Sequence, residues 1–133
     1  MKRIRVLMAI LGVDQHEVGA VTVSKYLMDA GIEVVYGGKF LLPPTIVKMA
    51  VEEDVDLIGL SCHSWEYLHF VPELVELLEK ERITIPVVVG GSVVTEKDKE
   101  SILQQGVSAA FGPMATAEEI VECIGQIVKE ETE

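Results

Sequence analysis

The sequence has little cysteine: Cys62 and Cys123 are the two among 133 residues. They lie far apart and lack the close spacing of zinc ligands. A disulfide framework of the kind that holds small secreted domains together needs more cysteines than these. We therefore expect neither a zinc site nor structural disulfides, and we expect the protein to reside in the reducing cytoplasm.

Basic residues are also scarce, because 11 Lys and Arg stand against 22 Asp and Glu, which gives a formal charge of −11. Proteins that bind the phosphate backbone of nucleic acids need clustered positive charge. We therefore expect no nucleic-acid partner, and we interpret most of the acidic side chains as solvated faces of helices.

Long apolar runs are missing, since none approaches the roughly 20 residues that a membrane-spanning helix needs. The basic start at residues 1–5 resembles that of a signal peptide, but the apolar run after it breaks at Gly12 and Asp14. We expect no membrane partner and no secretory leader. Without internal repeats or linkers, residues 1–133 are predicted to form a single domain.

Aromatic residues make up only 5% of the chain, whereas hydrophobic residues of all kinds make up 49%. Such an aliphatic composition is typical of parallel strands that are buried on both faces. Apolar runs predict five strands, at residues 4–11, 32–36, 57–60, 86–89 and 109–111. A segment with helical spacing follows each of them.

Several of these helices carry start and stop signals. Apolar spacing over residues 20–30 predicts a first helix, which Gly31 ends. Glycines 37–38 predict a turn after the second strand. Thr95 and Thr116 are predicted N-caps of the last two helices.

Strict alternation of strands and helices predicts an α/β three-layer sandwich, because right-handed crossovers place helices on both faces of a parallel sheet. We expect a flavodoxin-like fold with five parallel strands in the order 2-1-3-4-5. The loops after strands one, three and four then lie at one edge, around the point where the strand order reverses. Ligands of such sheets bind at this position.

The first of these loops, residues 12–19, carries the most informative motif. Asp14 and His16 are two residues apart on a glycine-flanked segment. The carboxylate could accept a proton from one imidazole nitrogen and leave the other free to bind a metal or to act as a base. A solvated loop histidine is the alternative that spacing alone leaves open.

Three motifs, taken together and in their order along the chain, favour a functional His16 over a solvated loop histidine. Asp14-x-His16-x-x-Gly19 follows the first strand, Ser61 ends the third, and Gly90-Gly91 ends the fourth. Together they resemble the cobalamin-binding domain of the adenosylcobalamin-dependent mutases, especially the methylmalonyl-CoA mutase type. The resemblance covers nearly the whole chain.

The resemblance implies that the cofactor, adenosylcobalamin, is bound with its own base displaced from cobalt. His16 would be the lower axial cobalt ligand, and Asp14 would hold its imidazole. Gly19, Ser61 and Gly90-Gly91 would line a pocket for the released nucleotide tail. A branched side chain at Gly91 is accordingly expected to project into the space of that tail.

The sequence also departs from the family pattern. Ile10 stands where mutases of this type commonly have lysine, and Gln15 replaces a usual glycine. His63 occupies one of the two places after Ser61 where the family usually has x-Leu. We include Gln15 and His63 among the cofactor-binding candidates. His63 and Trp65 could form a second metal site, but a polar rim beside the tail pocket is the favoured interpretation.

The resemblance implies the small, cobalamin-carrying subunit of a carbon-skeleton mutase, an isomerase of acyl-CoA substrates. Such a subunit is expected to be inactive alone and to need a large barrel-type catalytic subunit, in a heteromer of open stoichiometry. One alternative is a corrinoid methyl carrier that uses methylcobalamin, although such carriers usually have an N-terminal helical module. A regulatory or nucleotide-binding module is the other, although the acidic cluster of receiver domains and the Gly-rich phosphate motifs are missing.

Overall fold

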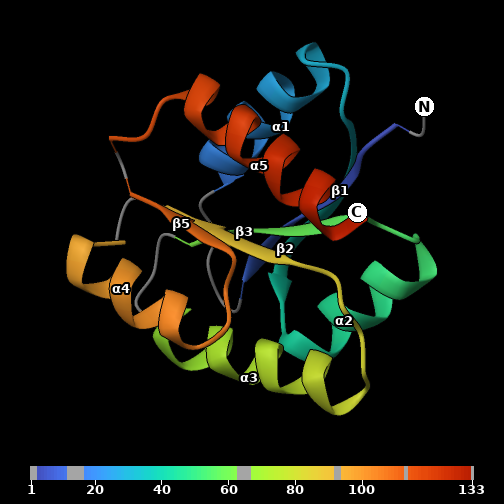
Figure 1. Ribbon diagram of the computed structural model, residues 1–133, viewed down its shortest axis with the longest axis vertical. Helices are drawn as coiled ribbons and strands as arrows, with labels where there is room; N and C mark the ends of the chain where they lie inside the picture. The colour runs from blue at the N-terminus through green and yellow to red at the C-terminus, as the bar shows by residue number, and fades with distance from the viewer. Residues whose placement is uncertain (1–2, 12–16, 63–66, 92–93, 113, 133) are drawn as a thin grey trace.

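Five parallel strands form one sheet with helices on both faces, as the computed structural model in Figure 1 shows. The structure describes residues 3–11, 17–62, 67–91, 94–112 and 114–132. The strands are β1 (Arg5–Leu11), β2 (Glu33–Leu41), β3 (Leu57–Ser61), β4 (Val87–Gly90) and β5 (Ala109–Phe111). Their order is β2-β1-β3-β4-β5, so the predicted flavodoxin-like topology is confirmed.

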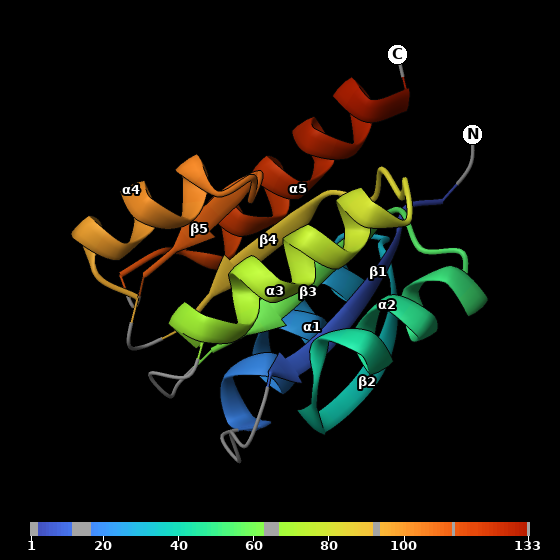
Figure 2. The ribbon, with the colours of Figure 1, turned by 90° about the horizontal axis from the view of Figure 1, so that it is seen from below.

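The helices divide between the two faces of the sheet. They are α1 (Glu17–Asp29), α2 (Pro43–Glu52), α3 (Tyr67–Lys80), α4 (Glu96–Gln104) and α5 (Ala117–Thr132). Helices α1 and α5 cover one face, and α2, α3 and α4 cover the other (Figures 1 and 2). The chain therefore changes faces after β2, which makes the gap between β1 and β3 the topological switch point.

The predicted helix signals are found where the sequence places them. Helix α1 ends at Asp29, and Gly31 follows with a φ of +87°, a conformation that glycine adopts readily. The Thr95 hydroxyl accepts a hydrogen bond from the Asp98 N–H at 3.1 Å. The Thr116 hydroxyl caps α5 in the same way.

The predicted turn at residues 37–38 is wrong, because β2 continues through both glycines to Leu41. In the register with β1, Met8 faces Tyr36 and Ala9 faces Gly38, so Gly37 is an extra residue in β2. Gly38 has a φ of +95°. The glycines therefore form a bulge that bends the strand without ending it.

Alternation along the strands separates two hydrophobic cores. On the α2, α3 and α4 side the larger core contains Leu7, Ile58 and Val89. On the α1 and α5 side the smaller core contains Ile10 and Val88. Ile10 is fully buried, so the position at which the sequence departs from the resembling pattern is a core residue of β1.

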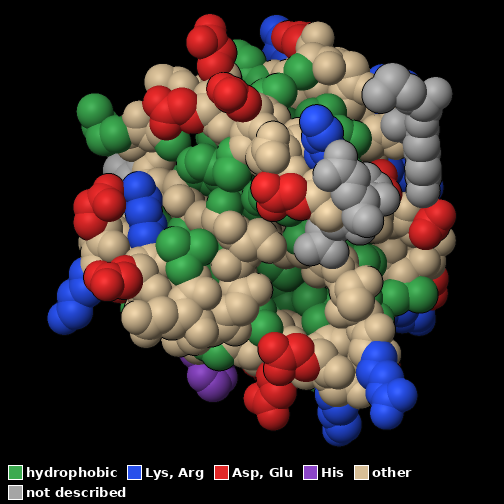
Figure 3. All heavy atoms as spheres, viewed as in Figure 1, with side chains coloured by type: hydrophobic (Ala, Val, Ile, Leu, Met, Phe, Trp, Pro, Cys, Tyr) green, Lys and Arg blue, Asp and Glu red, His purple; other side chains and the backbone are tan. Residues whose placement is uncertain are grey.

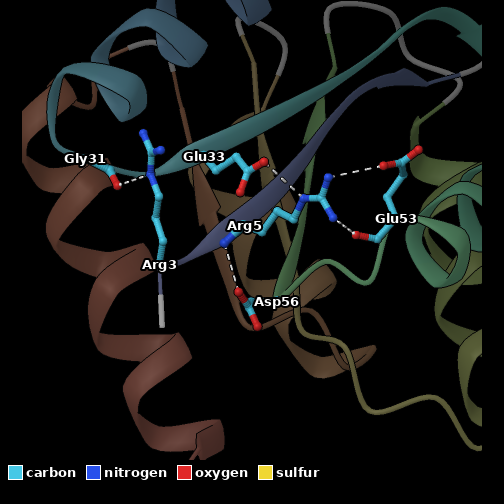
Figure 4. Close-up of polar contacts among 6 residues, drawn as sticks. All are labelled: Arg3, Arg5, Gly31, Glu33, Glu53 and Asp56. Carbon is cyan, nitrogen blue, oxygen red and sulfur yellow. Dashed lines mark hydrogen bonds and ion pairs between the residues drawn. The ribbon is translucent and has the colours of Figure 1, made fainter. Parts of the chain in front are cut away.

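Arg5 joins the amino ends of β1, β2 and β3 (Figure 4). Its guanidinium donates to the Glu53 carbonyl oxygen and lies 3.3 Å from the Glu53 carboxylate and 3.5 Å from that of Glu33. The Arg5 N–H donates to the Asp56 carboxylate at 2.8 Å. These contacts connect the three strands at the amino edge of the sheet.

The surface carries both signs of charge. On the face in Figure 3, Lys and Arg side chains stand among Asp and Glu and do not gather into one broad area. Within the part of the chain that the structure describes, we find no helix both long enough and apolar enough to cross a membrane.

Candidate functional site

A cavity of about 320 Å³ opens at the carboxyl edge of the sheet, between the strands and helices α1 and α5. Its volume is at the lower end of the range for small-molecule sites, roughly 300–1,000 Å³. The described residues that line it are mostly small or aliphatic: Met8, Ala20, Val23, Gly59, Leu60, Ser61, Val88, Gly90, Gly91, Phe111, Gly112, Ala115, Ile120 and Ile124.

The cavity exists because small residues stand where the strands would otherwise project large side chains. Alternation directs β3 positions 57, 59 and 61 toward α1 and α5. The first is a buried leucine, but the next two are Gly59 and Ser61. Gly90 lies opposite Ser61 in the register between β3 and β4. Its missing side chain extends the hollow to the next strand.

Ser61 is the one described lining residue with a polar side chain. It is the last residue of β3 and only 7% exposed. A ligand that enters the cavity therefore meets a hydroxyl at the edge of the sheet and hydrocarbon deeper inside. Such a lining suits an apolar group better than a charged one.

Gly59 is a cavity residue that the sequence interpretation missed. A Cβ at this position would meet the Met8 methyl carbon at 3.4 Å, which is ordinary contact. The backbone around Gly59 therefore tolerates a side chain, and the absence of one leaves room in the cavity. The available signal was a glycine inside an otherwise aliphatic buried strand, which indicates a close approach of some kind.

Gly91 lines the cavity, but a side chain at this position would not point into it. A Cβ there would lie 1.6 Å from the Cys62 carbonyl oxygen, so it would point into the backbone directly after β3. The surrounding backbone is tied by the Cys62 N–H, which donates to the Gly90 carbonyl at 2.7 Å. The expectation that a branched residue at Gly91 would project into the ligand space is therefore wrong.

Tyr67 and Asp98 connect helices α3 and α4 on the other face of the sheet. The Tyr67 hydroxyl donates to the Asp98 carboxylate at 2.7 Å. Burial, together with this bond and the Asp98 charge, raises the pKa of Tyr67 above its usual range. The same bond holds the pKa of Asp98 below its usual value. The pair joins the first turns of α3 and α4, which follow β3 and β4.

Five other residues are predicted to belong to the site: Asp14, Gln15, His16, Gly19 and His63. Asp14, Gln15, His16 and His63 lie outside the described residues, so their roles stay predictions. Gly19 lies in the first turn of α1. Among the residues that the structure describes, no three His, Cys, Asp or Glu side chains are grouped in a way that could hold a metal ion.

Segment 12–16 connects two elements that both contribute residues to the cavity lining. It joins β1, whose Met8 lines the cavity, to α1, whose Ala20 and Val23 also line it. A comparison with protein families decides the interpretation of this arrangement. The B12 binding domain family matches residues 4–122. The chain belongs to the B12-binding domain family.

Curated relatives of this B12-binding chain include small subunits of mutases. It is 42% identical over 121 residues to the pivalyl-CoA mutase small subunit of Xanthobacter autotrophicus, covering 91% of this chain and 81% of that one. It is 33% identical to the 2-hydroxyisobutanoyl-CoA mutase small subunit of Aquincola tertiaricarbonis, covering 94% and 92%. Methylmalonyl-CoA mutase of Escherichia coli is 35% identical, over 84% of this chain but only 16% of that enzyme.

Solved structures with the same fold include more than one functional class. A cobalamin-binding protein from Desulfitobacterium hafniense matches with a TM-score of 0.79 and 26% identity, covering 96% of this chain and 60% of that one. A Francisella response regulator receiver domain matches with a TM-score of 0.75 and 17% identity, covering 97% and 99%. The second likeness shows the fold alone, so the family match and the mutase relatives confirm the predicted cobalamin-binding, mutase-like character of the chain.

Proposed function

We propose that the chain is the cobalamin-binding small subunit of an acyl-CoA mutase. The observation that carries this proposal is the cavity at the carboxyl edge, hollowed by Gly59, Ser61 and Gly90 and bordered by the two elements that segment 12–16 connects. Its apolar lining fits a bicyclic aromatic base, and its position between β1 and α1, which segment 12–16 connects in the sequence, supports a cofactor whose base has left the cobalt.

In this proposal the two motif residues His16 and Asp14 have different roles. His16 would be a ligand of the cobalt, and Asp14 would fix the tautomer and orientation of its imidazole, as carboxylates commonly do for metal-bound histidines. Gln15, Gly19 and His63 would lie along the tail at the rim. Bound cobalamin supplies a cobalt–carbon bond whose homolysis starts radical chemistry.

Residues at the carboxyl edge of the sheet would position the nucleotide tail of cobalamin. Ser61 would offer a hydroxyl where the tail enters, while Met8 and Val88 would contact the buried base. Gly91 would act indirectly, because it lets the β4 backbone approach Cys62 and so shapes the cavity mouth. These interactions require no movement of the sheet, whose hydrogen bonds are continuous up to Ser61 and Gly90.

A large catalytic subunit of the barrel type would cover the cofactor. Radical intermediates must be kept from water, and closure of the site excludes such side reactions. Two relatives are themselves small subunits of mutases, which supports a large partner. Met114, next to the cavity-lining Ala115, is 89% exposed and would offer an apolar contact to such a partner.

Electron paramagnetic resonance of the Co(II) form tests the cobalt ligand. We expect the nitrogen splitting to change when histidine is labelled with nitrogen-15, and His16→Ala to abolish that response. His69→Ala is the matched control, because His69 is exposed on α3 and is assigned no ligand role. Splitting that responds only to label in the cofactor's own base would contradict the proposal.

The subunit role has its own test. Purified chain with adenosylcobalamin should not turn over an acyl-CoA substrate until a large catalytic subunit is added, and cobalamin should tighten their association because it would form part of the interface. Turnover by the isolated chain would refute the subunit assignment. Methyl transfer from methylcobalamin without mutase activity would favour the methyl-carrier alternative.

A further inference from the structure

A groove of about 650 Å³ runs between helices α2 and α3, on the face of the sheet opposite α1 and α5 (Figures 1 and 2). The apolar residues among its described lining are Pro44, Val47, Val51, Leu77 and Ile83. Val51 is 54% exposed, and among the large hydrophobic residues that the structure describes only Met114 is more exposed. The groove is therefore an apolar surface that the domain itself leaves open to solvent.

The charges at this groove balance each other. The other described lining residues are two lysines and two glutamates: Lys48, Glu52, Lys80 and Glu81. Their formal charges sum to zero, whereas the chain as a whole carries −11. That excess of negative charge makes two copies of the chain repel each other over most of their surfaces. At the groove, two copies can meet without bringing a net like charge together.

We propose that this groove is the surface through which two copies of the chain associate as a two-fold dimer. In a two-fold contact the same patch meets itself, so the patch must be self-complementary. Lys48 and Glu52 are one turn apart on α2, and Val51 lies in the same stripe of the helix. When two α2 helices cross in opposite directions, Lys48 faces the partner's Glu52 and Val51 reaches the apolar floor of the partner's groove.

The ion pair within one copy leaves these charged groups available. Lys48 Nζ lies 4.0 Å from the Glu52 carboxylate, and the two side chains are 75% and 61% exposed. An exposed pair of this kind holds its members together only weakly. In the dimer, every lysine of the stripe keeps a glutamate partner while Val51 is removed from water, which favours association.

The contact region around Val51 and the cofactor cavity lie at different edges of the sheet. Helix α2 ends at Glu52, shortly before β3 begins at Leu57, and α3 ends at Lys80, before β4 begins at Val87. These helix ends therefore lie toward the amino edge, whereas the cavity opens at the carboxyl edge. A second copy in the groove leaves the cavity free, so the dimer does not depend on the proposed function. In a mutase it would join two small subunits, each with its own catalytic subunit.

Sedimentation equilibrium of the full chain, without cofactor or catalytic subunit, tests the dimer. We expect a reversible monomer–dimer equilibrium between micromolar and millimolar concentrations. Val51→Glu should weaken the dimer at least about tenfold, because it places a charge against the apolar floor of the partner's groove. Leu103→Glu on α4 is the matched control, since Leu103 is 46% exposed and is not among the residues lining the groove. It should dimerise like the unchanged protein, and circular dichroism verifies that both variants are folded.

Exchange of the two charges tests the two-fold arrangement. Lys48→Glu and Glu52→Lys should each weaken the dimer about threefold or more, because like charges then meet across the axis. A mixture of these two variants should form heterodimers in preference to homodimers, and the variant that carries both substitutions should dimerise like the unchanged protein. A mixture without that preference would overturn the two-fold contact.

Three other results would overturn the groove as a dimer surface. One is an unchanged chain that stays monomeric at millimolar concentration. Another is a dimer that Val51→Glu leaves intact, which would place the contact elsewhere. The third is protection of α2 from hydrogen exchange only when the catalytic subunit is added, which would assign the groove to that subunit instead.

Discussion

Removal of one hydroxyl, in Tyr67→Phe, should destabilise the domain measurably. The Tyr67 side chain is 1% exposed, and its hydroxyl donates at 2.7 Å to the Asp98 carboxylate. The ring itself packs in the core beneath α3 and is retained by phenylalanine. The substitution therefore isolates a single hydrogen bond between the starts of α3 and α4.

The expected magnitude follows from the charge of the acceptor. Hydrogen bonds to charged groups contribute about 1.5–3 kcal/mol, and the partly exposed Asp98 places this one at the lower end. A loss of about 1.5 kcal/mol corresponds to a fall in the unfolding midpoint of roughly 4–8 °C for a chain of this length. Thermal and urea unfolding followed by circular dichroism would measure both quantities.

The pH dependence of stability provides an independent measurement. Because folding raises the pKa of Tyr67, its contribution is complete below about pH 10, the usual tyrosine pKa, and is lost as the pH rises further. Because folding lowers the pKa of Asp98, its contribution is present above about pH 4 and is lost in acid. The alkaline loss should be smaller in Tyr67→Phe.

Tyr26→Phe is the matched control, because Tyr26 is 46% exposed on α1. It should unfold like the unchanged protein. A double-mutant cycle with Asp98→Ala should return a coupling of about 1 kcal/mol or more between the two side chains. Equal midpoints for Tyr67→Phe and Tyr26→Phe, or a coupling near zero, would refute the assigned role.

Three further substitutions test other parts of the architecture. Gly91→Ala should cost at least about 2 kcal/mol in urea unfolding, because its Cβ would overlap the Cys62 carbonyl oxygen; wild-type stability would contradict this geometry. Arg5→Leu should cost about 1 kcal/mol, since its ion pairs are partly exposed, and the cost should shrink at high salt. Thr116→Ala should cost about 1 kcal/mol and reduce helicity by circular dichroism, because α5 loses its N-cap bond.

Elements whose signals are local could be predicted from the sequence. Apolar runs indicate each strand, and Gly31, Thr95 and Thr116 mark helix boundaries where the structure has them. The bulge in β2 could not be predicted, because it depends on the register with β1, 28 residues earlier at Arg5 and Glu33. A pair of glycines indicates a turn equally well until that pairing is known.

The site residues also divide into those that the sequence predicts and those whose role depends on the three-dimensional fold. Ser61 and Gly90 were predicted at the cavity because both end parallel strands that meet at one edge. Gly59 was missed, since a glycine inside a buried strand serves packing and binding alike in sequence. The direction of the missing Gly91 side chain depends on how closely β4 and β3 approach. The Tyr67 and Asp98 bond joins residues 31 positions apart that only the fold brings together.

The two faces of the sheet have different tasks, and this division explains how one fold can hold unrelated functions. The α2, α3 and α4 face contains the larger core and the Tyr67 bond, and it keeps the strands in place. The α1 and α5 face lacks side-chain volume at Gly59 in β3, which borders the switch point, and at Gly90 in the neighbouring β4. Receiver domains match the same fold with TM-scores of 0.75 and 0.76. The fold therefore determines where a cavity can form, and the small residues on one face of the sheet determine that this chain has one there.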